Sequence, residues 1–164
     1  MKLFIKRFFF LMFGIISLLA AIAGVEYFGG QPMGLFSGSR PANLGYRDGQ
    51  FSPPSWKPNC VSSTVGKNDP HYIEPLALSA APDTAWKKLQ GIVKGLPRVN
   101  VVQDGAGYLY AEFTSAGLGF VDDVEFARDD KAGVIHVRSA SRLGVRDFNV
   151  NRDRIESIRA RLAN

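Results

Sequence analysis

The chain has few of the residues that most often carry chemistry. Its 164 residues include one cysteine, Cys60, and two histidines, His71 and His136. A single cysteine excludes an intramolecular disulfide and a multi-cysteine zinc site, and the two histidines lack the helical spacing of a zinc motif. The sequence also has no phosphate-binding loop, dinucleotide-binding glycine motif or nucleophile elbow. We therefore predict no metal site and no cofactor.

The chain also lacks a clear excess of positive charge outside its N-terminus. It has 20 basic and 15 acidic residues, and its formal charge is +5. Lys2, Lys6 and Arg7 precede the first acidic residue, Glu26, so 17 basic residues remain against the same 15 acidic ones. Nucleic-acid binding needs a basic patch on the folded domain. A balance of +2 does not indicate one, and we expect no nucleic-acid partner.

One feature is present in excess, an uncharged apolar run over residues 8–25. At about 1.5 Å per residue, a helix of this length spans roughly 27 Å, close to the hydrocarbon core of a bilayer. The basic residues before the run place Met1 in the cytoplasm and the rest of the chain on the other side. We expect a single-pass inner-membrane protein whose globular domain faces the periplasm or an equivalent lumen.

The same run also fits a signal peptide. Ala21-Ile22-Ala23 has small residues where a signal peptidase cleaves, and cleavage would release the domain into the periplasm. Retention and cleavage both stay open. The predicted organisation is an anchor or signal peptide over 1–26, a linker over 27–42 and one globular domain over 43–164. Glycine and proline recur through 27–58, which indicates an extended arm lying on the domain.

Hydrophobic periodicity predicts an α+β fold. A helix starts at Pro82 and ends at Gly95 and Pro97, and its apolar face is Ala85, Trp86, Leu89, Ile92, Val93 and Leu96. A period of two then predicts four strands with short connections, over 98–104, 108–115, 120–128 and 134–140. Short connections make neighbouring strands antiparallel. We expect a four-stranded antiparallel meander with an N-terminal and a C-terminal helix on one face and the arm on part of the other.

The C-terminal helix is predicted over 152–162, with Asn151 as its cap. Ile155, Ile158 and Leu162 form its apolar stripe. Its arginines are interpreted as a solvated face: Arg152, Arg154, Arg159 and Arg161.

Alternation in the strands indicates a polar sheet face. Tyr110 and Glu112 lie opposite the apolar side of their strand, whereas Asp122 falls on the side that should be apolar. A buried carboxylate needs a partner, so we expect Asp122 or Asp123 to pair with Arg138 or Arg142. Two interpretations stay open: a structural ion pair, or an anion-binding site built on the arginines.

Cys60 and His71 form a second candidate site. A thiol becomes a nucleophile when a base or cation lowers its pKa, and His71 follows within eleven residues. Asp69, Asp122 or Asp123 could orient the histidine. The alternative is a packed, inert cysteine, because free cysteine is among the most buried residue types.

Several segments, in this order, resemble the family catalogued as domain of unknown function 1499. They cover roughly residues 43–162 and include Pro58-Asn59-Cys60-Val61-Ser62-Ser63, His71 with Ile73-Glu74-Pro75-Leu76, Tyr108-Leu109-Tyr110-Ala111-Glu112, Phe120-Val121-Asp122-Asp123-Val124-Glu125-Phe126 and Val137-Arg138-Ser139-Ala140-Ser141-Arg142. The resemblance implies a small extracytoplasmic or membrane-anchored protein, and it gives no activity.

Two functional expectations follow. The first is a non-enzymatic binding or assembly module tethered to the membrane, with a protein partner or a small anionic ligand. Its pocket would lie between the arm and the open sheet face, lined by Tyr110, Glu112, Asp123, Arg138 and Arg142. The alternative is a small thiol-dependent hydrolase or transferase that uses Cys60 and His71.

Overall fold

The computed structural model describes residues 36–79 and 81–164. The predicted membrane segment over 8–25 and the Ala21-Ile22-Ala23 cleavage pattern lie outside these residues. Within the described part, no helix combines the length and apolarity needed to cross a membrane.

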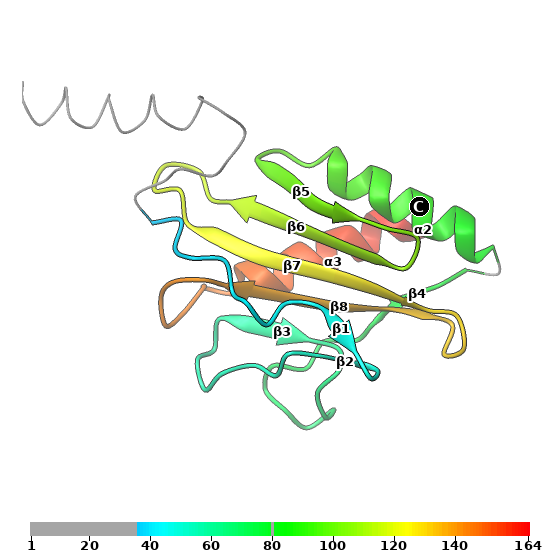
Figure 1. The fold of residues 1–164 in the computed structure, drawn as a ribbon, viewed down its shortest axis with the longest axis horizontal. Helices are drawn as coiled ribbons and strands as arrows, with labels where there is room; N and C mark the ends of the chain where they lie inside the picture. Colours follow the sequence, from blue (N-terminus) through cyan, green and yellow to red (C-terminus); the bar gives the residue numbers. More distant parts are fainter. Residues whose placement is uncertain (1–35, 80) are drawn as a thin grey trace, which may run out of the picture.

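The four predicted strands form the antiparallel meander that the sequence indicates (Figure 1). They are β5 (Val99–Asp104), β6 (Tyr108–Thr114), β7 (Val121–Asp129) and β8 (Val134–Ser141). The register sets Glu112 opposite Asp123 and Glu125 opposite Arg138. Because paired residues point to the same side of a sheet, this register gathers charged side chains on one face.

The prediction of four strands was wrong, because the sheet has six. β3 (Cys60–Ser62) and β4 (Leu76–Ala77) both pair antiparallel with the outer edge of β8, and the sheet order is β3-β8-β7-β6-β5. β1 (Tyr46–Arg47) and β2 (Gln50–Phe51) form a separate hairpin within the arm. Strands of two or three residues are too short for alternation to reveal, but they cover an edge that would otherwise be unpaired.

Two helices cover one face of the sheet, as predicted (Figure 1). They are α2 (Pro82–Lys94) and α3 (Val150–Ala163). Their apolar faces pack on the inward side chains of the strands, and the fully or nearly fully buried members of this core include Trp86, Leu89, Val93, Leu109, Val124, Phe126, Ile135, Val137, Ile155 and Ile158. The indole N–H of Trp86 donates to the Gly105 carbonyl at 2.9 Å, so its one polar atom is satisfied.

The start of α3 differs from the prediction. Asn149, not Asn151, is the N-cap residue, and its side chain makes no capping hydrogen bond. The carboxylate of Asp147 takes that role: Oδ1 accepts from the backbone N–H of Asn149 and Oδ2 from that of Asn151. Asn151 is buried, and its side-chain amide donates to the Asn59 carbonyl at 3.1 Å.

The arginines of α3 are not simply a solvated face. Arg154 pairs with Asp122 at 2.5 Å and lies over the Phe113 ring. Arg152 donates to the Tyr72 carbonyl at 2.8 Å, and Arg159 donates to the carbonyls of Glu74 and Pro75. Helical spacing puts Arg152 and Arg159 on one side of α3 and Arg154 on another. The segment before α2, which accepts the hydrogen bonds of Arg152 and Arg159, could not be placed from the sequence.

The arm crosses the sheet face opposite the helices (Figure 1). It is anchored there at three points. Arg40 donates to Glu112 at 2.8 Å, the Gly45 backbone N–H donates to Glu125 at 2.7 Å, and the Ser52 carbonyl accepts from Arg138 at 3.1 Å. Each contact uses a charged side chain of the sheet.

Candidate functional site

The structure brings together the polar residues predicted from strand alternation. Arg142, just beyond β8, donates through Nη2 to Asp123 at 2.7 Å and to the Tyr110 hydroxyl at 3.2 Å, and it also contacts Glu112. The Tyr110 hydroxyl lies 2.6 Å from Asp123 Oδ1. Asp123 therefore pairs with Arg142, as one of the predicted alternatives required.

Glu125 forms the other half of this cluster. It accepts from the Tyr108 hydroxyl at 2.7 Å and from Arg138 at 3.1 Å, in addition to the Gly45 backbone. We call the set the sheet-face network, and its charged members are Arg40, Glu112, Asp123, Glu125, Arg138 and Arg142. Three carboxylates thus meet three guanidinium groups, so the network is balanced in charge.

The network is closed and internally satisfied. Glu112, Asp123 and Glu125 are at most 1% exposed. Among the described residues, no buried side-chain nitrogen or oxygen lacks a hydrogen-bond partner. Neither of the two cavities described below is lined by a charged residue of the network. The arm contacts Glu112, Glu125 and Arg138 on the face where the pocket is expected.

The pKa values in the network follow from this mutual bonding. Burial acts to raise the pKa of Glu112, but hydrogen bonds from Arg142, Arg40 and Asn100 outweigh it and hold that pKa below its ordinary value. Burial and the neighbouring Asp123 raise the pKa of the Tyr110 hydroxyl. The carboxylate is therefore kept ionised and the phenol neutral, as a fixed ion network requires.

Asp122 does not join this network. It lies on the helix face, where alternation predicts it, but its partner is Arg154 of α3 rather than Arg138 or Arg142. The pair lines a cavity of 260 Å³ at the end of the sheet, together with apolar residues that include Leu96, Phe113 and Ile158.

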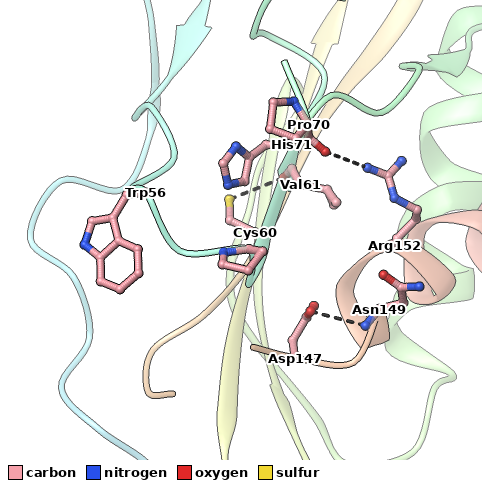
Figure 2. Close-up of a pocket in the computed structure, with 9 residues that line it drawn as sticks. Trp56, Cys60, Val61, Pro70, His71, Asp147, Asn149 and Arg152 are labelled. Carbon is pink, nitrogen blue, oxygen red and sulfur yellow. Dashed lines mark hydrogen bonds between the residues drawn. The ribbon is translucent and has the colours of Figure 1, made fainter. Parts of the chain in front are cut away.

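A different cavity contains the second predicted pair. It measures 180 Å³ and is lined by three separate stretches of chain (Figure 2), with Trp56, Pro58, Cys60, Val61, Pro70, His71, Asp147, Asn149 and Arg152 as lining residues. We call it the Trp56 cavity. Cys60, the first residue of β3, and His71, in the loop that follows, therefore line one cavity.

The thiol of Cys60 is not activated by this arrangement. Its side chain is buried, and Sγ lies 3.6 Å from the Val61 carbonyl oxygen. Burial raises the pKa of the thiol to about 11; Arg138 opposes this shift less strongly than burial promotes it, and nearby carboxylates add to the rise. A nucleophilic cysteine needs the opposite shift.

Both ring nitrogens of His71 are engaged. Nδ1 lies 2.8 Å from Asp69 Oδ1, and Nε2 lies 3.0 Å from the Lys57 carbonyl oxygen. Both of these partners are hydrogen-bond acceptors. Asp69, one of the three carboxylates predicted to contact His71, is therefore beside it. Neither nitrogen, however, is left to accept a proton from Cys60.

The remaining polar groups of the Trp56 cavity come from the start of α3. Arg152 uses Nη2 to hold the carbonyls of Pro70 and Tyr72, and among the described residues its Nε and Nη1 make no hydrogen bond. Asp147 already accepts from Asn149 and Asn151. Trp56 is 78% exposed. In the described part of the chain, no three histidine, cysteine or acidic side chains group as a metal would require.

Sequence reasoning missed Trp56, Asp147 and Arg152 at this cavity, and Arg40 and Glu125 in the network. Glu125 was recoverable, since alternation puts it beside Asp123. Trp56 lies among prolines, where no hydrophobic periodicity predicts its position. Arg152 was interpreted as part of a solvent-exposed helix face. Only the fold brings these residues beside Cys60.

Comparison with known proteins gives a family but no activity. No curated protein and no solved structure matches the chain. A family described as "Protein of unknown function (DUF1499)" matches residues 50–162. The matched region contains every lining residue of the Trp56 cavity and all charged members of the sheet-face network except Arg40. The match confirms the resemblance found in the sequence, and the chain belongs to this DUF1499 family.

Proposed function

We propose that the chain is a membrane-tethered, extracytoplasmic binding module that takes one anionic group into the Trp56 cavity. The observation that carries the proposal is the cavity itself, where Nε and Nη1 of Arg152 make no hydrogen bond with the described residues. In the sheet-face network, by contrast, the carboxylates are at most 1% exposed and the charged groups bond one another and the arm.

The guanidinium of Arg152 favours an anion. Its Nε and Nη1 have no partner among the described residues. The one carboxylate of the cavity, Asp147, is occupied by the backbone of α3. A carboxylate or phosphate group would find a planar guanidinium to bind, and guanidinium groups bind both in a bidentate manner.

The size of the cavity limits what enters. Ligand pockets for drug-sized molecules measure about 300–1,000 Å³, whereas this one measures 180 Å³. It suits a single group, either a small anion or the charged end of a longer ligand. The exposed ring of Trp56 at the rim offers an apolar surface to whatever part stays outside.

The membrane tether rests on the sequence. The apolar run over 8–25 has the length of a bilayer span and follows three basic residues. A domain held in this way on the periplasmic or lumenal side meets ligands or protein partners of that compartment.

The proposal is tested by titrating the purified full-length protein in detergent with acetate and with inorganic phosphate. The readout is the fluorescence of Trp56. Trp86, the other tryptophan of the chain, is 3% exposed and gives a constant background. We expect saturable binding that Arg152→Ala weakens by about tenfold or more, as loss of a charged hydrogen bond does. Arg161→Ala, an exposed arginine of the same helix, is the matched control and should bind like the parent.

Equal binding by the parent and Arg152→Ala would contradict the proposal. Since Arg152 also holds the Pro70 and Tyr72 carbonyls, the unfolding midpoint of each variant is measured alongside. Trp86 emission reports separately whether the core is intact.

One observation favours the alternative function, a thiol-dependent hydrolase or transferase. Cys60 and His71 line the same cavity, as that mechanism needs. The raised pKa of the thiol and the two occupied histidine nitrogens oppose it. The reactivity of Cys60, treated below, separates the two functions.

A further inference from the structure

The exposed large hydrophobic residues of the described chain are concentrated at one end of the domain. Eight such residues are exposed, and only Val102 lies on β5, away from the rest. Seven belong to the start of the arm, the segment before β3, the β6–β7 turn and the connection from β8 into α3. We call them the apolar end: Phe36, Trp56, Leu118, Leu143, Val145, Phe148 and Val150.

Contacts tie these four segments to one another. Phe36 stacks on Phe120, which follows the β6–β7 turn, with ring centroids 5.0 Å apart. A Cβ atom on Gly38 would come within 3.1 Å of Leu143, so the arm and the β8–α3 connection touch. Asn59 donates to the Gly144 carbonyl at 3.0 Å. Figure 1 shows the arm, the β6–β7 turn and the β8–α3 connection at the same end of the sheet.

Phe148 is held outward by its backbone. It is 89% exposed, and both Phe148 and Asn149 have positive φ angles, 54° and 68°. Such conformations cost non-glycine residues about 1–3 kcal/mol each and occur mainly at functional sites. Asp147 fixes the pair through its bonds to the backbone of Asn149 and Asn151. The chain thus holds a strained turn that presents a phenylalanine to solvent.

The position of the tether indicates what covers this surface. The described chain begins at Phe36, within the apolar end, and the apolar run stops at residue 25. The ten intervening residues reach at most roughly 35 Å when fully extended. The tether therefore joins the domain at the end that carries Phe36, within reach of the bilayer.

The charge of the surface suits phospholipid headgroups. The segments that form the apolar end, residues 36–40, 52–59, 115–120 and 142–150, contain one acidic residue, Asp147, whose oxygens already accept from the backbone. Arg146 is exposed and Lys57 is partly exposed among the hydrophobic side chains. Aromatic rings with flanking basic residues are typical of surfaces that rest in the membrane interface.

We propose that the apolar end docks on the lipid surface of the same membrane that holds the N-terminal segment, with Trp56 and Phe148 entering the interface. This inference rests on the proposed tether and adds an orientation to it. The Trp56 cavity then opens beside the lipid headgroups, because Trp56 belongs to both features.

The experiment uses full-length protein reconstituted in vesicles of phosphatidylcholine and phosphatidylglycerol, with and without bromine on the acyl chains. Residues 1–35 contain no tryptophan, and Trp86 is buried in the core, so lipid contact is reported by Trp56. We expect Trp56 emission at shorter wavelength than in detergent-free water, with its intensity lowered by about half or more by brominated chains, as for an indole at headgroup depth.

Phe148→Ser should reduce this quenching, and Trp56→Phe should remove it. Val102→Ser changes the exposed hydrophobic residue outside the apolar end and should leave the quenching unchanged. Water-like, unquenched Trp56 emission would overturn the proposal. A shift that grows with the protein-to-lipid ratio without quenching would also overturn it, because the occupant would then be a second copy. Anion binding in detergent does not depend on these outcomes, so the cavity and the orientation are tested separately.

Discussion

On one face of the sheet, β6, β7 and β8 present Leu109, Val124 and Val137 to the helices; on the other, the same strands present Glu112, Glu125 and Arg138 to the arm. Both faces are buried. The helix face is stabilised by apolar area removed from water, which tolerates small changes in shape. The arm face is stabilised only while each charged group keeps its partners. A buried ion without a partner lowers the free energy of unfolding by several kcal/mol.

The contrast separates stability from function. A face whose buried charges bond one another and the arm tolerates few substitutions. The Trp56 cavity lies at the sheet edge beside β3, where the arm and α3 leave donors unpaired. We therefore propose that the sheet-face network stabilises the fold and that the Trp56 cavity binds the ligand.

The largest effect should come from removing Arg142. The guanidinium serves Asp123, Glu112 and Tyr110 together and its side chain is 5% exposed. Arg142→Met should lower the free energy of unfolding by about 3–5 kcal/mol, because it leaves buried carboxylates without their cation. Urea denaturation followed by Trp86 fluorescence measures the loss.

A second substitution should reverse part of that loss. In Arg142→Met with Asp123→Leu, Glu112 keeps Arg40 and Asn100 as partners. We expect the double variant to be more stable than the single Arg142→Met variant. A double variant that is less stable by the full sum of both single losses would show that the two side chains are not coupled.

Leu109→Ala tests the helix face. This side chain is 0% exposed in the core, and its truncation should cost about 2–5 kcal/mol. The loss should be the same at pH 4 and pH 7, and it should not change with salt, since no charge is involved. A strong dependence on pH would mean that the two faces are not independent.

Cys60 should react slowly in the folded protein. A rise of the thiol pKa from 9.0 to about 11 lowers the thiolate fraction near pH 8 about 100-fold, and burial slows alkylation further. Iodoacetamide labelling of native and urea-unfolded protein, followed by mass spectrometry, gives the ratio of rates. Labelling of the native protein as fast as that of the unfolded chain would support the thiol-dependent enzyme instead.

The smallest expected effect is on the stability of the protein at acidic pH. The pKa of Glu112 is held below its ordinary value of 4.5, so its stabilising contribution is present above that pH and is lost as the pH falls through the lower value in the folded protein. Glu112→Gln should be less stable at neutral pH and should lose less on acidification than the parent. Parallel stability curves for the two proteins would contradict the assigned role.

The sequence predicted the parts of this fold that follow from local periodicity. Val124 and Phe126 alternate with Asp123 and Glu125, so the sequence alone predicts which residues lie on each face of the sheet. β3 and β4 were not, because two or three residues show no period. The closing of the arm over Glu112 by Arg40 depends on contacts 72 residues apart.

The same limit applies to the candidate sites. Asp123 and Arg142 met as predicted, since neighbouring strands fix their positions. Asp122 pairs with Arg154 because α3 packs over this end of the strand. The presence of Cys60, His71 and Arg152 in one cavity depends on how the segment before α2 folds back. A local sequence pattern does not predict such contacts between segments that are far apart in the chain.

Native mass spectrometry of the full-length protein, extracted gently from its own membranes, tests the central claim most directly. We expect an anionic small-molecule adduct on the parent and on Glu112→Gln, and its loss in Arg152→Ala. A bare parent chain, or an adduct that Glu112→Gln loses and Arg152→Ala keeps, would contradict the account and return the binding site to the sheet face.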